Sequence, residues 1–178
     1  QGYSSAASDV YKRQILKGYN SDVIGFTQSI EPMLEKWHKK ALILGTGGAS
    51  KAIDYGLKAL GLETVFVSRF KRPGTVLYKD VTPEVIKEYN VIVNCTPCGM
   101  YPHTEECPEL PYEAMDNHTI LYDLIYNPDE TLFMKKGKVH GANTKNGLEM
   151  LLLQAFASWE FWNGKNSEQQ TPMSPTVE

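Results

Sequence analysis

Short, continuous runs of apolar residues recur along the chain from about residue 40 onward. Such runs are typical of parallel strands that are buried on both faces. They predict strands over residues 41–44, 64–67, 91–93 and 120–124, with a short last strand over 138–140. The stretches between them space apolar residues as helices do, and they predict helices over 52–60, 83–89, 129–137 and 147–162. This alternation predicts an α/β fold, a doubly wound parallel sheet with helices on both faces.

The segments outside this alternation are expected to add less to the core. Residues 1–14 are rich in serine and alanine and show no period, so we expect a disordered or non-native leader. Residues 23–38 have a spacing that suits a helix, interrupted near Pro32. Residues 164–178 are polar and contain two prolines, which predicts a disordered tail. The folded domain is therefore expected to lie within residues 39–163.

A glycine-rich turn, Gly45-Thr46-Gly47-Gly48-Ala49-Ser50, directly follows the first predicted strand. In the order strand, glycine-rich turn, helix, strand, such a turn indicates a Rossmann-like dinucleotide-binding domain. Gly45 allows the tight turn, Gly47 lets the backbone approach a pyrophosphate, and the small Ser50 lets the helix pack on the strand. The first N–H groups of the helix and the positive end of its dipole then face the phosphates. The alternative is a structural turn without a ligand.

The residues after the second strand indicate which dinucleotide is bound. NAD-binding domains have a carboxylate there, which accepts a hydrogen bond from the ribose 2′-hydroxyl. This chain has Ser68-Arg69-Phe70-Lys71-Arg72 instead, with three cations and no acid. An arginine such as Arg69 can lie against adenine and donate two hydrogen bonds to a 2′-phosphate. We therefore predict NADP as the cofactor, and the alternative is a basic loop that only faces solvent.

Composition excludes several other classes of protein. The net charge of −3 provides no basic field for nucleic acid or anionic membrane, and no apolar run is long enough to span a bilayer. The first residues lack the apolar stretch of an export signal, and three cysteines do not make a disulfide scaffold. We therefore expect a cytoplasmic protein that binds neither nucleic acid nor membranes. We predict a monomer or homodimer.

Cys95 and Cys98 form a Cys-x-x-Cys pair, with His103 and Cys107 close by in the sequence. Zinc sites usually need a second tight pair of ligands, and redox pairs of this type open a helix instead of closing a strand. We therefore predict no metal site and interpret the segment as a loop that passes near the nicotinamide.

Five segments, in order along the chain, match the motifs of one enzyme family. They are residues 18–22 (GYNSD), the glycine-rich turn with the 68–71 loop, 94–100 (NCTPCGM), 122–128 (YDLIYNP) and 146–155 (NGLEMLLLQA). They resemble the G-x-N-T-D motif (with serine for threonine), the NADP-binding turn and loop, and the N-x-T-P-x-G-M, Y-D-x-x-Y-N-P and N-G-x-x-M-L…Q-A motifs of shikimate dehydrogenases. The resemblance covers about residues 15–164.

The resemblance implies reversible hydride transfer between NADP(H) and 3-dehydroshikimate/shikimate, in the biosynthesis of chorismate and the aromatic amino acids. It also implies roles by position. The pyrophosphate would be held by Gly45, Thr46, Gly47, Gly48 and Ala49, the adenosine phosphate by Ser68, Arg69, Phe70 and Lys71, and the nicotinamide by Leu124 and Gly147. Asp22 would act in catalysis and, with Tyr126 and Gln154, would bind the substrate.

The chain departs from the family before Asp22. The family has a substrate domain there, with a lysine that pairs with the aspartate, whereas only 21 residues precede Asp22 here. We therefore interpret residues 15–38 as a remnant of the linker to that domain and the chain as a fragment. Because the lysine is the family's acceptor for the hydroxyl proton, we expect NADP binding with slow or no turnover. A non-catalytic NADP-binding module and a quinate/shikimate dehydrogenase remain alternatives, although the basic loop speaks against the second.

Overall fold

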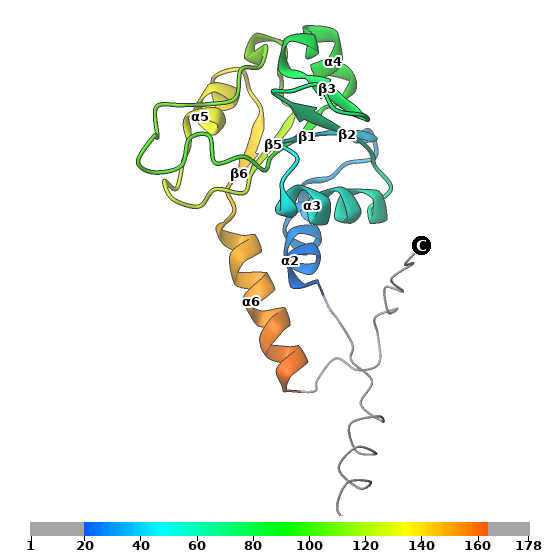
Figure 1. Cartoon of the computed structure of the whole chain (residues 1–178), viewed down its shortest axis with the longest axis vertical. Coiled ribbons are helices and arrows are strands. Elements are labelled where there is room, and N and C mark those ends of the chain that lie inside the picture. Colours follow the sequence, from blue (N-terminus) through cyan, green and yellow to red (C-terminus); the bar gives the residue numbers. More distant parts are fainter. Residues whose placement is uncertain (1–19, 164–178) are drawn as a thin grey trace, which may run out of the picture.

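The structure is a computed structural model that describes residues 20–163 (Figure 1). The expected leader over residues 1–14 and the expected tail over 164–178 lie outside the described residues. Six parallel strands form one sheet in the order β3-β2-β1-β4-β5-β6. The strands are β1 Lys40–Leu44, β2 Glu63–Ser68, β3 Thr75–Leu77, β4 Val91–Asn94, β5 Ile120–Asp123 and β6 Asn143–Lys145. The helices are α2 Ser21–Ile30, α3 Gly48–Ala59, α4 Pro83–Glu88, α5 Leu132–Val139 and α6 Leu148–Trp162, with short 3-10 turns at Glu31–Met33, Tyr78–Asp80 and Tyr112–Ala114.

Helices cover both faces of the sheet because successive side chains of a strand point to opposite faces. In β1, Ala41 and Ile43 are buried in one core with residues of α2, α3 and α6. Leu42 and Leu44 are buried in a second core with residues of α4 and α5. Both faces of the central strands are therefore apolar, as the continuous hydrophobic runs predicted. The predicted α/β, Rossmann-like, doubly wound fold is confirmed.

Helix α2 lies beside α6, although the two helices come from opposite ends of the described chain (Figure 1). Gly25 makes this close approach possible, since an added Cβ would lie 2.6 Å from the Met150 carbonyl oxygen. The buried Ser29 hydroxyl donates to Glu149 Oε2 at 2.7 Å and accepts from the Tyr122 hydroxyl at 2.9 Å. Ser29 thus joins α2 to both α6 and β5. No helix within residues 20–163 has the length and apolar character needed to cross a bilayer.

Three elements differ from the sequence-based prediction. The predicted strand over 138–140 is wrong, because α5 continues to Val139 and the last strand is Asn143–Lys145. The helix predicted over 23–38 is α-helical only over Ser21–Ile30, and a 3-10 turn containing Pro32 follows it. The short edge strand Thr75–Leu77 was not predicted.

Candidate cofactor-binding site

The loops that carry the predicted cofactor residues meet at one edge of the sheet. In a parallel sheet the carboxyl ends of all strands lie at the same edge, and a crevice opens where the strand order reverses direction. Here the reversal lies between β1 and β4, which are hydrogen-bonded neighbours. The loops after β1, β2, β4 and β5 therefore lie at the edge of the sheet where such a crevice is expected.

The glycine-rich turn leaves β1 and leads directly into α3. Gly45 has φ +101°, in the left-handed region that favours glycine, and an added Cβ would lie 2.9 Å from Thr96 Cγ2. Gly47 is the N-cap of α3 and has no side chain to cap it, while Ser50 is buried and donates to the Gly47 carbonyl at 2.6 Å. A Cβ at Gly47 or Gly48 would have no atom within 4 Å. The first N–H groups of α3 therefore border open space that a phosphate would fit.

The basic loop after β2 approaches this turn. Ser68 accepts a hydrogen bond from the Phe70 N–H at 3.2 Å, which folds the loop back on the strand end. Arg72 Nη1 donates to Thr46 Oγ1 at 3.5 Å and so links the loop to the glycine-rich turn. Arg69 and Phe70 are exposed, and the Arg69 guanidinium lies 6.0 Å from the Phe70 ring centre. Arg72, a cation outside the residues assigned to the site, thus links the loop to the turn. The assignment of the cofactor residues themselves stays a prediction.

Leu124 and Gly147 are also brought together. An added Cβ on Gly147 would lie 2.1 Å from the Leu124 carbonyl oxygen, and the Gly147 N–H donates to the Ile125 carbonyl at 3.1 Å. The start of α6 therefore packs against the backbone of Leu124 and Ile125, directly after β5.

The three residues assigned to the substrate lie on α2, on α6 and in the loop after β5. Asp22 is in the first turn of α2, which Asn20 caps by accepting from the N–H groups of Asp22 and Val23. The backbone of Gln154 packs on the same helix, since the Gln154 backbone nitrogen would lie 2.9 Å from a Cβ on Gly25. Asp22 and Gln154 thus come from the two helices that cross at Gly25. Tyr126 is 53% exposed, and within residues 20–163 no hydrogen bond joins it to Asp22 or Gln154.

A buried polar cluster at the same edge was not predicted as part of the site. Asn94 ends β4, Asp123 ends β5, and Asn94 Nδ2 donates to Asp123 Oδ1 at 3.0 Å. Thr131 Oγ1 donates to Asp123 Oδ2 at 2.6 Å. Burial raises the pKa of Asp123 from 3.8 to about 6, against the opposing effect of its hydrogen bonds from Thr131, Ile125 and Asn94. The motifs around positions 94 and 123 indicated these loops, but only the strand register shows that the two side chains meet.

The cysteines next to this cluster are free thiols. Burial raises the pKa of Cys95 and that of Cys98, so both remain protonated at neutral pH and are poor nucleophiles. Burial also raises the pKa of the neighbouring Tyr78 to about 12. These shifts favour the interpretation of Cys95-x-x-Cys98 as a strand-end loop over a redox pair.

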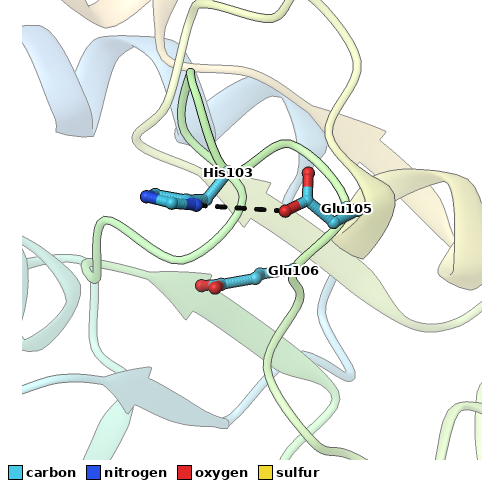
Figure 2. A group of neighbouring side chains, drawn as sticks. All are labelled: His103, Glu105 and Glu106. Atoms are coloured by element: carbon cyan, nitrogen blue, oxygen red, sulfur yellow. Dashed lines mark ion pairs between the residues drawn. The ribbon is translucent and has the colours of Figure 1, made fainter.

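A second group of potential ligands lies farther along the loop. His103, Glu105 and Glu106 place one ligand atom each within 4.8 Å of one another, and Figure 2 shows the ion pair from His103 to Glu105. All three side chains are exposed and come from one surface stretch, where a cation would keep much of its water. We assign no metal to them, and the absence of a metal site stays a prediction.

The geometry can be compared with known proteins, although no family model matches the chain. The shikimate dehydrogenase (NADP(+)) of Carboxydothermus hydrogenoformans is 37% identical over 170 residues, which cover 87% of this chain and 61% of that protein. The enzyme of the same name from Crocosphaera subtropica is 36% identical over 193 residues, covering 97% of this chain and 65% of that protein.

Solved structures agree with these sequence relatives. Shikimate 5-dehydrogenase from Thermus thermophilus, in complex with NADP(H) and shikimate, superposes with a TM-score of 0.70 and 30% identity, over 83% of this chain and 57% of that one. A chorismate mutase/shikimate 5-dehydrogenase fusion protein from Clostridium acetobutylicum gives a TM-score of 0.67 and 35% identity, over 83% and 55%. This chain thus spans less than two thirds of the length of these relatives. The resemblance predicted from the sequence motifs is confirmed, and the chain is homologous to the shikimate dehydrogenase family.

Proposed function

We propose that this chain binds NADP(H) at the carboxyl edge of its sheet and serves the shikimate dehydrogenase reaction. The observation that carries the proposal is the open N-terminus of α3 facing a basic loop, with Arg72 bonded to Thr46 across the gap between them. Backbone N–H groups at a helix N-terminus suit a pyrophosphate, and guanidinium groups suit a 2′-phosphate. The region 39–163 is the proposed cofactor domain, and a cytoplasmic location is part of the same proposal.

NADPH supplies the hydride that reduces the carbonyl of 3-dehydroshikimate to the hydroxyl of shikimate. The residues of this chain bind and orient the reactants. The glycine-rich turn holds the pyrophosphate, the Ser68–Lys71 loop holds the 2′-phosphate, and Leu124 with Gly147 borders the nicotinamide. On the substrate side, Asp22 accepts a hydrogen bond from the reacting hydroxyl, and Tyr126 and Gln154 supply further polar contacts.

The proton of that hydroxyl needs an acceptor when the hydride leaves. Within residues 20–163 the carboxylate of Asp22 forms no ion pair, so no cation of this region assists it. The proposal therefore includes slow or no turnover by the chain as given. The same observation favours a second candidate, a non-catalytic NADP-binding module. Measurable oxidation of shikimate with NADP⁺ by the purified chain would reject the module.

Calorimetric titration of the chain with NADP⁺ and with NAD⁺ tests the cofactor assignment. We expect NADP⁺ to bind at least tenfold more tightly than NAD⁺. Arg69→Ala should weaken NADP⁺ binding about 10- to 100-fold, because a charge-assisted hydrogen bond contributes about 1.5–3 kcal/mol, and should leave NAD⁺ binding unchanged. Lys36→Ala is the matched control, since it removes an exposed cation before β1, at the opposite edge of the sheet. No binding of either nucleotide, or no preference between them, would overturn the proposal.

A further inference from the structure

Asn94 and Asp123 occupy paired positions at the carboxyl ends of two neighbouring strands. They are partners in the register of β4 with β5, and both side chains are fully buried. The hydrogen bond from Asn94 Nδ2 to Asp123 Oδ1 therefore joins the points at which the two strands end. Each residue is also the last residue of its strand, directly before a loop of the proposed site.

Both side chains turn back to hold the loop that follows their own strand. Asn94 Oδ1 accepts from the Thr96 N–H at 3.0 Å and from the Thr96 hydroxyl at 2.7 Å. Asp123 Oδ1 accepts from the Ile125 N–H at 3.1 Å, and Oδ2 accepts from the Thr131 hydroxyl. The pair thus fixes the two loops to each other as well as to the sheet.

These loops reach the proposed cofactor at two places. The Thr96 methyl group lies against Gly45, in the turn assigned to the pyrophosphate. The Leu124 carbonyl, next to Asp123, lies against Gly147 and belongs to the wall assigned to the nicotinamide. The Asn94–Asp123 bond therefore links the loop beside the pyrophosphate turn to the loop that forms the nicotinamide wall.

Stability alone does not account for the carboxylate. Asp123 is buried, and within residues 20–163 it forms no ion pair with a cation. Only hydrogen bonds from neutral donors stabilise its ionised carboxylate. Desolvating a charge under these conditions is unfavourable, and apolar residues of similar volume often hold a fold as well or better. Two strands already paired by backbone hydrogen bonds do not need this pair to stay together.

We propose that Asn94 and Asp123 are positioning residues, which set the nicotinamide wall at Leu124 relative to the pyrophosphate turn at Gly45 and so orient the ring of the bound dinucleotide. This inference rests on the proposed function. It assigns the pair no direct contact with the cofactor. It therefore predicts that loss of the pair affects the nicotinamide end of the ligand and spares the adenosine end.

The test compares two ligands on the same variants of the full chain. One ligand is NADPH, and the other is 2′-phospho-ADP-ribose, which has the same phosphates and adenosine but no nicotinamide. In Asp123→Ala we expect the affinity for NADPH, relative to that for the fragment, to fall at least fivefold, while fragment binding stays within twofold of wild type. The fluorescence of the bound reduced nicotinamide should fall toward that of the free nucleotide.

A conservative variant and a matched control separate positioning from general damage. Asp123→Asn keeps the shape, with Oδ1 placed to accept from Asn94 and Ile125 and Nδ2 placed to donate to Thr131, and it should restore most of the NADPH preference. Ser29→Ala disturbs a buried hydroxyl on α2 and should change neither affinity. If Asp123→Ala does not fold, Thr131→Val removes the hydrogen bond to Asp123 Oδ2 and must show the same selective loss.

The outcomes distinguish this inference from the proposed function. Wild-type protein that binds neither ligand would overturn the proposed function itself. Wild-type binding with an equal loss of both ligands in Asp123→Ala, or with no loss, would overturn the positioning role alone. A wild-type affinity ratio of one with no change in nicotinamide fluorescence would also overturn it, because the ring would then have no fixed place.

Discussion

The Leu124 carbonyl oxygen lies 2.1 Å from the place that a Cβ atom on Gly147 would occupy. Gly147 has φ −78°, a conformation open to any residue, so the glycine is required by the neighbouring chain and not by its own backbone. The N–H of Gly147 also donates to the Ile125 carbonyl at 3.1 Å. The start of α6 is thus fixed against the backbone beyond β5.

Gly147→Ala is expected to destabilise the protein by about 2–4 kcal/mol, because one of the two backbones must move away from the other. Urea unfolding followed by circular dichroism measures the change. Gly48→Ala is the matched control, since a Cβ there has no atom within 4 Å and alanine favours a helix. It should leave stability unchanged or raise it by up to about 1 kcal/mol. Equal effects of the two substitutions would contradict this account of Gly147.

Gly47→Ala is expected to separate cofactor binding from stability. Gly47 has φ −79° and open space around it, so alanine should keep the midpoint of thermal unfolding close to that of wild type. If a pyrophosphate occupies the open space, the added methyl group should weaken NADP⁺ binding about tenfold or more, a loss of about 1.4 kcal/mol. Thermal unfolding and calorimetry on one preparation check both parts. Unchanged affinity would show that no phosphate approaches this residue.

Ser29→Ala is expected to destabilise the protein by about 1–3 kcal/mol, because it leaves the buried Tyr122 hydroxyl without its acceptor. Tyr122→Phe removes the other partner. The double variant should therefore lose less stability than the sum of the two single variants. A double-mutant cycle by urea unfolding measures this coupling. Strict additivity would show that the bond contributes nothing to stability.

The stability contributed by Asp123 is expected to fall as the pH rises. Its pKa is raised from 3.8 to about 6, so the folded protein holds this proton more tightly than the unfolded chain does. The stabilisation is therefore complete below about pH 3.8 and is lost as the pH rises through about 6. At about 1.4 kcal/mol for each pKa unit, the whole change is about 3 kcal/mol.

Comparison with Asp123→Asn isolates this titration, because the other ionisable groups are common to both proteins. The free energy of unfolding of wild type minus that of the variant should decrease between pH 4.5 and pH 7.5, roughly as the carboxyl ionises. Urea titrations at four pH values across this range suffice. A difference that is flat, or that increases with pH, would show that burial does not raise this pKa.

The sequence predicted the parts of the fold whose pattern is local. The run Ala41–Leu44 and the turn after it identified β1, α3 and the proposed phosphate site. A buried strand needs a continuous apolar run and a tight turn needs glycine, so both features are visible in the sequence. The last strand has no such apolar pattern, since Asn143–Lys145 contains no apolar residue. The stretch 138–140 was mistaken for it because Val139 lies between polar neighbours, as in a strand. In the structure Val139 is instead the last residue of α5, whose first turn is capped by Thr131.

Contacts between distant residues could not be predicted in the same way. Asn94 and Asp123 are 29 positions apart, and their contact depends on the register of β4 with β5. Arg72 and Thr46 are 26 positions apart and meet because β1 and β2 are neighbours. The motifs identified each loop separately, whereas the sheet determines which loops face one another.

The packing of α2 against α6 has a consequence for how the protein is made. Ser29 and Glu149 are bonded across 120 positions of sequence, so α2 cannot complete its contacts until α6 has been synthesised. Domains fold during synthesis as their parts emerge, and contacts of long sequence separation form late. Phe26 and Ile30, both fully buried in the folded structure, therefore stay partly uncovered on the nascent chain until α6 has emerged from the ribosome.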